Sequence, residues 1–115
     1  MATGKVEKIF DAQSLSDTDT WTLSPWINIL GYAKVLIFLK NNDSSNTMQY
    51  KIDARADIDD SDSEYALKTA TDLTAGSSIY ETLSDAWEGI RIGIRRKTSG
   101  ETISSVDGFV TRKRR

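Results

Sequence analysis

The chain has 115 residues, of which 28% are charged and 38% are hydrophobic, and its formal net charge is −2. This length suits one domain with a single two-layer core, and this composition is typical of a folded chain rather than a disordered one. Histidine and cysteine are both absent, which excludes disulfides, thiolate metal sites and the Ser-His and Cys-His nucleophile pairs. We therefore expect a protein that is not an enzyme and that carries no cofactor.

The distribution of charge is uneven along the chain. Residues 1–90 carry 7 basic and 15 acidic side chains, a net charge of −8, whereas residues 91–115 carry 8 basic and 2 acidic ones, a net charge of +6. Such polarity favours contact with copies of the same chain or with a charged partner. No apolar run approaches the roughly 20 residues of a membrane helix, and residues 1–13 lack a signal-peptide core, so we expect synthesis in the cytoplasm and no membrane contact.

The first predicted strand covers residues 5–12 and precedes a turn-prone stretch at 13–20. Trp21, Leu23 and Trp26 follow, and Pro25 marks a bend or a sheet edge among them. Residues 31–41 form the most informative strand, because apolar side chains occupy both of its faces. Leu36 and Phe38 lie on the face opposite Val35 and Ile37, which predicts a central strand whose second face is covered by another layer or subunit.

The rest of the chain continues the alternation of strand and turn. The Asn-rich stretch 41–46 predicts a hairpin into a strand at 48–57, which is apolar on one face and polar on the other. Further strands are expected at 65–71, 77–83, 90–95 and 101–111. These elements predict one all-β domain over residues 1–115, an antiparallel β-sandwich of about eight strands that is jelly-roll-like or immunoglobulin-like.

Two charged segments suggest binding sites. Carboxylates gathered on one loop are possible calcium ligands, although the spacing is not that of an EF-hand and a solvated turn explains them as well: Asp57, Asp59, Asp60 and Asp62. The tail at 111–115 is basic and, with Arg91, Arg95, Arg96 and Lys97, is a possible phosphate-binding face. We favour a peripheral arm that docks on an acidic protein surface, because nucleic-acid binding usually adds aromatic platforms.

Aromatic side chains raise a carbohydrate-binding alternative. Trp21, Trp26 and Tyr32 could stack on sugar faces, or they could fill the ends of the core. The carboxylate pairs Asp17/Asp19 and Glu81/Asp85 are interpreted as surface residues, since closeness in sequence says nothing about separation across a cleft.

The segment 31–100 resembles a known group of proteins. It contains the strand YAKVLIFLKN, an Asn-rich turn, a YKI strand, and the sequence Asp85-Ala86-Trp87 ahead of IRIGIRR. This succession is similar to small β-sandwich virion structural proteins of tailed bacteriophages and archaeal viruses. The resemblance implies a head decoration or cement protein, or another minor virion component, without catalytic residues.

The resemblance and the residues together define the expected partners. These are copies of the same chain and major capsid or other virion proteins, in a virion assembled from protein made in the host cytoplasm. The expected contact residues are Leu36, Phe38, Arg112, Lys113, Arg114 and Arg115.

Overall fold

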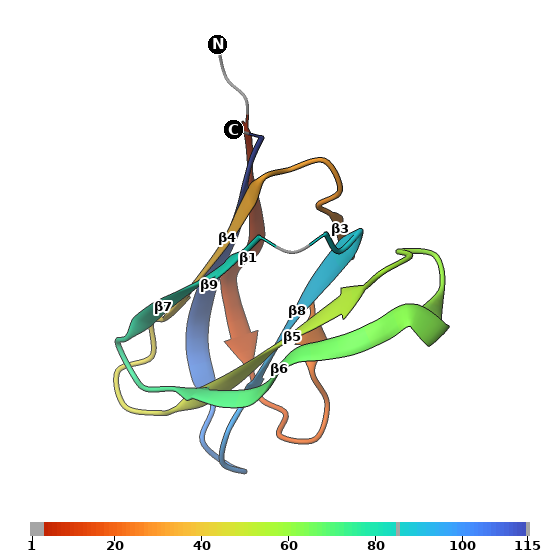
Figure 1. Ribbon diagram of the computed structural model, residues 1–115. Coiled ribbons are helices and arrows are strands. Elements are labelled where there is room, and N and C mark those ends of the chain that lie inside the picture. The colour runs from red at the N-terminus through yellow and green to blue at the C-terminus, as the bar shows by residue number, and fades with distance from the viewer. Residues whose placement is uncertain (1–3, 85, 115) are drawn as a thin grey trace.

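Two antiparallel sheets pack face to face in the computed structural model, which describes residues 4–84 and 86–114 (Figure 1). Sheet A has the strand order β1-β9-β4-β7, and sheet B has the order β2-β8-β5-β6, with β3 also paired to β8. The elements are β1 (Gly4–Leu15), β2 (Thr22–Leu23), β3 (Ile27–Asn28), β4 (Lys34–Asn41), β5 (Met48–Arg55), the short 3-10 helix η1 (Ser61–Ser63), β6 (Glu64–Leu73), β7 (Ser78–Leu83), β8 (Gly89–Arg96) and β9 (Ile103–Lys113).

The topology is that of a jelly roll. Apart from β2 with β3 and β5 with β6, successive strands lie in opposite sheets, and the last strand returns between β1 and β4. An immunoglobulin-like sandwich instead keeps several consecutive strands together in one sheet. The prediction of an all-β antiparallel sandwich is therefore confirmed, and the strand order selects the jelly-roll alternative. The part of the chain that the structure describes contains no helix long and apolar enough to span a membrane.

The core lies between the sheets and follows from the alternation within each strand. Val35, Ile37 and Leu39 of β4 are buried against the alternate isoleucines of β8, Ile90 and Ile92 among them. Because side chains of a strand point alternately to its two faces, each strand buries one set and leaves the other outside. The prediction that β4 is central is confirmed, since it pairs with β9 on one side and β7 on the other.

Pro25 interrupts the strand at one edge of sheet B, because proline has no N–H to donate to a neighbouring strand. β2 and β3 pair with the two ends of β8, and Ser24 bridges the gap between them. The Ser24 hydroxyl accepts the N–H of Ile92 at 2.9 Å, and the Ser24 N–H donates to the Ile92 carbonyl at 2.8 Å. The edge thus stays hydrogen-bonded across the bend.

The Asn-rich stretch 41–46 does not form the predicted hairpin. It crosses from sheet A to sheet B, because β4 and β5 each find both of their partners within their own sheet. Asn41 is fully buried at the crossing, where its amide donates to the carbonyls of Asn46 and Leu73, both at 3.0 Å. The turn-forming residues were correctly recognised, but they connect the two layers rather than neighbouring strands.

The edge strands of sheet A are irregular or short. β1 shifts register against β9 at several points, and Ala12 has a positive φ of 48° at one of them. The Ala12 N–H donates to the carboxylate of Asp107 at 2.9 Å, which stabilises this irregular backbone. β7, the other edge, spans only 6 residues.

Candidate functional site

The outer face of sheet A carries a strip of apolar side chains. In β4, Leu36 and Phe38 point away from the core. Each of them belongs to a row of outward-pointing side chains that continues across the neighbouring strands of sheet A. We name this surface the apolar strip; it consists of Val6, Leu36, Phe38, Tyr80 and Phe109. Val6 and Tyr80 are 66% and 69% exposed, and the other three members are half-buried. The outer face of a sandwich sheet is normally polar, so this strip across all four strands makes the outer face of sheet A unusually apolar.

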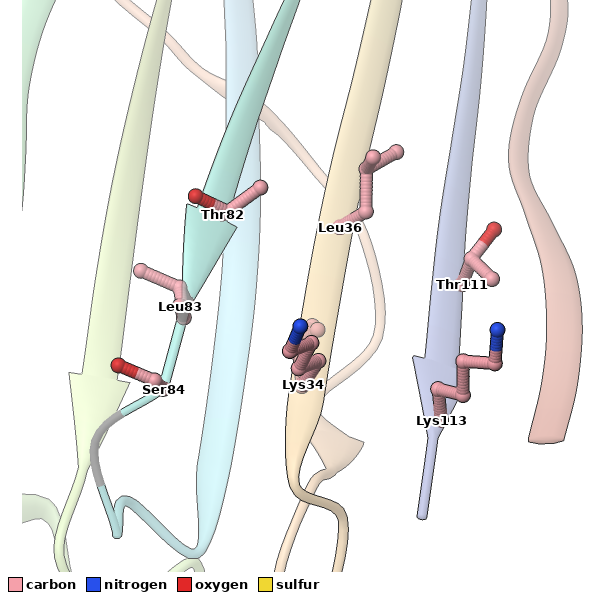
Figure 2. Close-up of a pocket in the computed structure, with 8 residues that line it drawn as sticks. Lys34, Leu36, Thr82, Leu83, Ser84, Thr111 and Lys113 are labelled. Atoms are coloured by element: carbon pink, nitrogen blue, oxygen red, sulfur yellow. The ribbon is translucent and has the colours of Figure 1, made fainter. Parts of the chain in front are cut away.

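A hollow of about 380 Å³ opens beside the strip, where β4, β7 and β9 end (Figure 2). Leu36 and Leu83 give its lining an apolar character, and Thr82 and Thr111 contribute hydroxyl groups. Lys34 and Lys113 complete the lining, and Figure 2 shows their side chains on adjacent strands. We refer to this feature as the lysine-rimmed hollow.

The two lysines of the hollow are directly opposite in the register of β4 and β9. Like charges at opposed positions of a sheet destabilise the pairing. Within residues 4–84 and 86–114, neither lysine forms an ion pair; the lysines that do are Lys8, Lys51, Lys68 and Lys97. The hollow therefore combines apolar surface with positive charge that an anionic group would neutralise.

The basic end of the chain, which the sequence predicted to be a peripheral arm, is in large part the end of a strand. β9 extends through Lys113, and Arg112 is only 5% exposed because it points into the sandwich. Its guanidinium donates to the Asn28 carbonyl at 2.7 Å and pairs with Glu7 at 3.0 Å. Arg112 thus stabilises the fold through contacts with two other segments of the chain. Lys113 and Arg114 are exposed, and Arg115 lies outside the described residues.

The tryptophans proposed as sugar platforms lie on the outer face of sheet B, outside the core. Each half-buried ring contacts two cations: Trp21 lies 4.1 Å from the Arg95 guanidinium and 5.1 Å from the Lys51 ammonium. Trp26 is 4.2 Å and 4.6 Å from the guanidinium groups of Arg55 and Arg91. These rings therefore contribute cation–π contacts to the fold, and they fill neither end of the core.

The third proposed platform has the same kind of environment. Tyr32 lies 5.4 Å from the Arg112 guanidinium and 5.2 Å from that of Arg114, and its ring packs partly against the core. Trp87 differs, because it stacks on Tyr65 with the ring centroids 5.9 Å apart. The sequence did not predict that arginines lie beside the tryptophans, since the two kinds of residue are far apart along the chain.

The cations of β8 form hydrogen bonds and ion pairs with other side chains on the outer face of sheet B. Arg95 donates to Gln49 at 3.1 Å, and Gln49 donates in turn to Asp72 at 3.1 Å. Arg91 and Lys51 both lie 3.3 Å from the buried carboxylate of Asp53. This network covers the outer face of β5. The polar side chains of β5 are therefore less exposed to solvent than the sequence predicted. The predicted continuous basic face does not form, because these residues and the end of β9 belong to different sheets.

The acidic stretch between β5 and β6 is a structured turn that includes η1. Asp57 accepts the N–H of Asp59 at 3.0 Å, and Asp60 accepts the N–H of Asp62 at 2.9 Å. Throughout 4–84 and 86–114, no three acidic side chains gather as ligands for a metal ion. Of the candidate calcium residues, Asp57 and Asp60 thus serve as local caps. Of the two carboxylate pairs, Asp17 caps its own turn by accepting from Asp19 and Thr20, and Asp85 lies outside the described residues.

Comparison with known proteins shows a fold likeness only. No protein-family model matches the chain, and no curated protein matches it in sequence. A chain in the structure of infectious bursal disease virus, Gx strain, is similar with a TM-score of 0.54 at 13% identity over 94% of this chain and 31% of that one. This chain therefore spans about a third of the viral chain.

Two further structures illustrate the breadth of the likeness. The SPBc2 prophage-derived protein YomS is similar over 97% of this chain and 96% of its own, with a TM-score of 0.54 and 5% identity. The isomalto-dextranase of Arthrobacter globiformis T6, solved with panose, is similar over 97% of this chain and 23% of its own, with a TM-score of 0.55 and 9% identity. At these identities, the likeness establishes that the chain has a β-sandwich fold that viral, prophage and carbohydrate-active proteins share.

Proposed function

We propose that the chain is a non-enzymatic structural protein of a virion, a capsid decoration, cement or minor component that acts through protein-protein contacts. The apolar strip is the observation that supports this proposal best. Tyr80, Phe38 and Phe109 lie in one row across β7, β4 and β9, and Leu36 and Val6 lie in the next row, so that Tyr80 and Val6 are exposed on the two edge strands. Surfaces of this kind are typical of sheets that pack against another protein layer.

The fold likeness supports the proposal in two ways. The prophage protein matches over nearly its whole length, so a protein of this size and fold is encoded in a phage-derived genome. The bursal disease virus chain contains a similar sandwich within a longer viral protein. The resemblance of segment 31–100 to small virion proteins is consistent with both.

The direct test is mass spectrometry of purified virus particles from cells that carry this gene. We expect the chain to be present in particles that have been purified by density, at a copy number fixed by the particle's symmetry. Its absence from such particles, although it is made in the same cells, would overturn the proposal.

The contact surface is tested by a matched pair of variants. Val6→Ser with Tyr80→Ser removes both exposed members of the apolar strip, and Leu30→Ser removes a side chain that is 57% exposed outside the strip. We expect the double variant to weaken association by about tenfold or more, as measured by light scattering or particle co-sedimentation. Leu30→Ser should associate like the unmodified protein; equal effects of both variants would contradict the assignment of the surface.

Carbohydrate binding is the second candidate, and half-exposed rings favour it. Trp21 and Trp26 each contact two cations, so a sugar would stack only on the ring surface that these cations leave free. Acrylamide quenching of tryptophan fluorescence, with and without panose, separates the two candidates. Protection of the tryptophans by panose would favour the glycan reading, and unchanged quenching would favour the virion one.

A further inference from the structure

Two groups of like charge have no ion-pair partner within the described fold, and they lie on different elements. On sheet B, cations such as Arg91 and Lys51 are paired with Asp53. At the lysine-rimmed hollow of sheet A, Lys34 and Lys113 have no such partner among the described residues, whose ion pairs lie elsewhere. The same ion pairs include none of the four aspartates between β5 and β6. We name these the acidic loop: Asp57, Asp59, Asp60 and Asp62.

The acidic loop presents its charge on a fixed scaffold. Asp57 and Asp60 are held by their bonds to backbone N–H groups, whereas the carboxylates of Asp59 and Asp62 make no hydrogen bond within the described residues. All four aspartates are exposed. Figure 1 shows that the connection between β5 and β6 projects away from the strands of sheet A. Among the described residues, no ion pair joins the acidic loop to the lysines of the hollow.

We propose that the acidic loop of one copy docks in the lysine-rimmed hollow of a second copy. This inference rests on the proposed function, because it names the neighbour that contacts the outer face of sheet A. The hollow offers two ammonium groups above apolar walls, and the carboxylates of Asp59 and Asp62 complement them in charge. The two surfaces differ, so the contact is heterologous and links copies head to tail into rings or chains.

The experiment uses two neutralised variants of the full chain. Lys34→Gln with Lys113→Gln removes the charge of the hollow, and Asp59→Asn with Asp62→Asn removes the charge of the acidic loop but keeps both backbone caps. We expect the unmodified protein to self-associate at low salt, less so as salt rises, and each double variant to associate at least about tenfold more weakly. A mixture of the two variants retains one intact pair of surfaces, so light scattering should detect a 1:1 complex that does not grow.

A third variant is the control. Asp19→Asn with Glu101→Gln removes two exposed charges from other loops, and neither residue forms an ion pair in the described fold. It should associate like the unmodified protein, and circular dichroism should show that all variants are folded. An unmodified protein that stays monomeric at low salt, variants that associate normally, or a mixture that stays monomeric would each overturn the inference. The virion assignment has a separate readout, the presence of the chain in purified particles, so either proposal can fail without the other.

Discussion

At the scale of single residues, Asp43 connects two loops that are far apart in the sequence. Its carboxylate accepts the backbone N–H of Ser104 at 2.9 Å and those of Asn46 and Ser45 at 2.7 and 3.1 Å. These bonds favour the ionised form, with that from Ser104 the strongest, and they lower the pKa of Asp43 from 3.8 to about 2. The crossing between the sheets is therefore stabilised by one negative charge.

This depressed pKa predicts loss of stability in acid. The ionised carboxylate contributes fully above pH 3.8, and its contribution is lost as the pH falls toward 2, because the unfolded chain binds the proton more readily. We expect urea midpoints to fall over this range in the unmodified protein. In Asp43→Asn, the midpoint at neutral pH should already be lower, and its further fall in acid should be smaller. An unchanged acid dependence in the variant would contradict the assignment.

Individual residues also show where prediction from sequence succeeds. The outward direction of Leu36 and Phe38 followed from alternation within one strand, and the structure confirms it. The apolar strip as a whole needed the register of four strands, so Val6 and Phe109 were not recognised as its members. The contacts of Arg112 within the fold were not foreseen for the same reason, because its partners Glu7 and Asn28 come from distant segments.

At the scale of elements, most strands were predictable and their pairing was not. The alternation of Ile90, Ile92 and Ile94, or of Met48, Tyr50 and Ile52, is a local signal that the structure confirms. Pairing depends on contacts between distant segments, and a turn rich in Asn and Asp suits a hairpin or a crossing equally well. The buried amide of Asn41 distinguishes the two, since it donates to the carbonyl of Asn46 within the crossing and to that of Leu73 in β6 of sheet B.

The crossing element is tested by Asn41→Ala. This change removes three hydrogen bonds: the two donated to the carbonyls of Asn46 and Leu73, and the one that the Asn41 side-chain oxygen accepts from the N–H of Asp43. We expect a loss of about 1–3 kcal/mol in the free energy of unfolding, as measured by urea denaturation. Ser44→Ala in the exposed part of the same turn is the control and should be nearly neutral. Equal effects at both positions would mean that the amide does not secure the crossing.

At the scale of the whole molecule, side-chain bonds link the two sheets at their margins. Arg112 of β9 in sheet A reaches the carbonyl of Asn28 in sheet B. Along another margin, the Tyr50 hydroxyl of sheet B donates to Glu81 of sheet A at 2.8 Å, and Lys68 pairs with the same carboxylate at 3.1 Å. Burial, followed by the bond to Glu81, raises the pKa of Tyr50, so this link persists through the neutral range.

Two truncations test the link made by Arg112. A chain ending at Lys113 keeps all of β9, whereas a chain ending at Thr111 loses the guanidinium that contacts Glu7 and Asn28. We expect the shorter chain to lose about 1.5–3 kcal/mol of stability and the longer one to unfold like the full chain in thermal melts. Identical melting of the two truncations would show that the basic end is dispensable for folding.

The irregular and short edges of sheet A bear on how the protein tolerates high concentration. A regular, exposed strand edge is a template on which further chains add by backbone pairing, and this leads to fibrils. The register shifts of β1 and the brevity of β7 make both edges poor templates. A cell can thus accumulate many copies of the chain while amyloid-like growth from these two edges stays disfavoured.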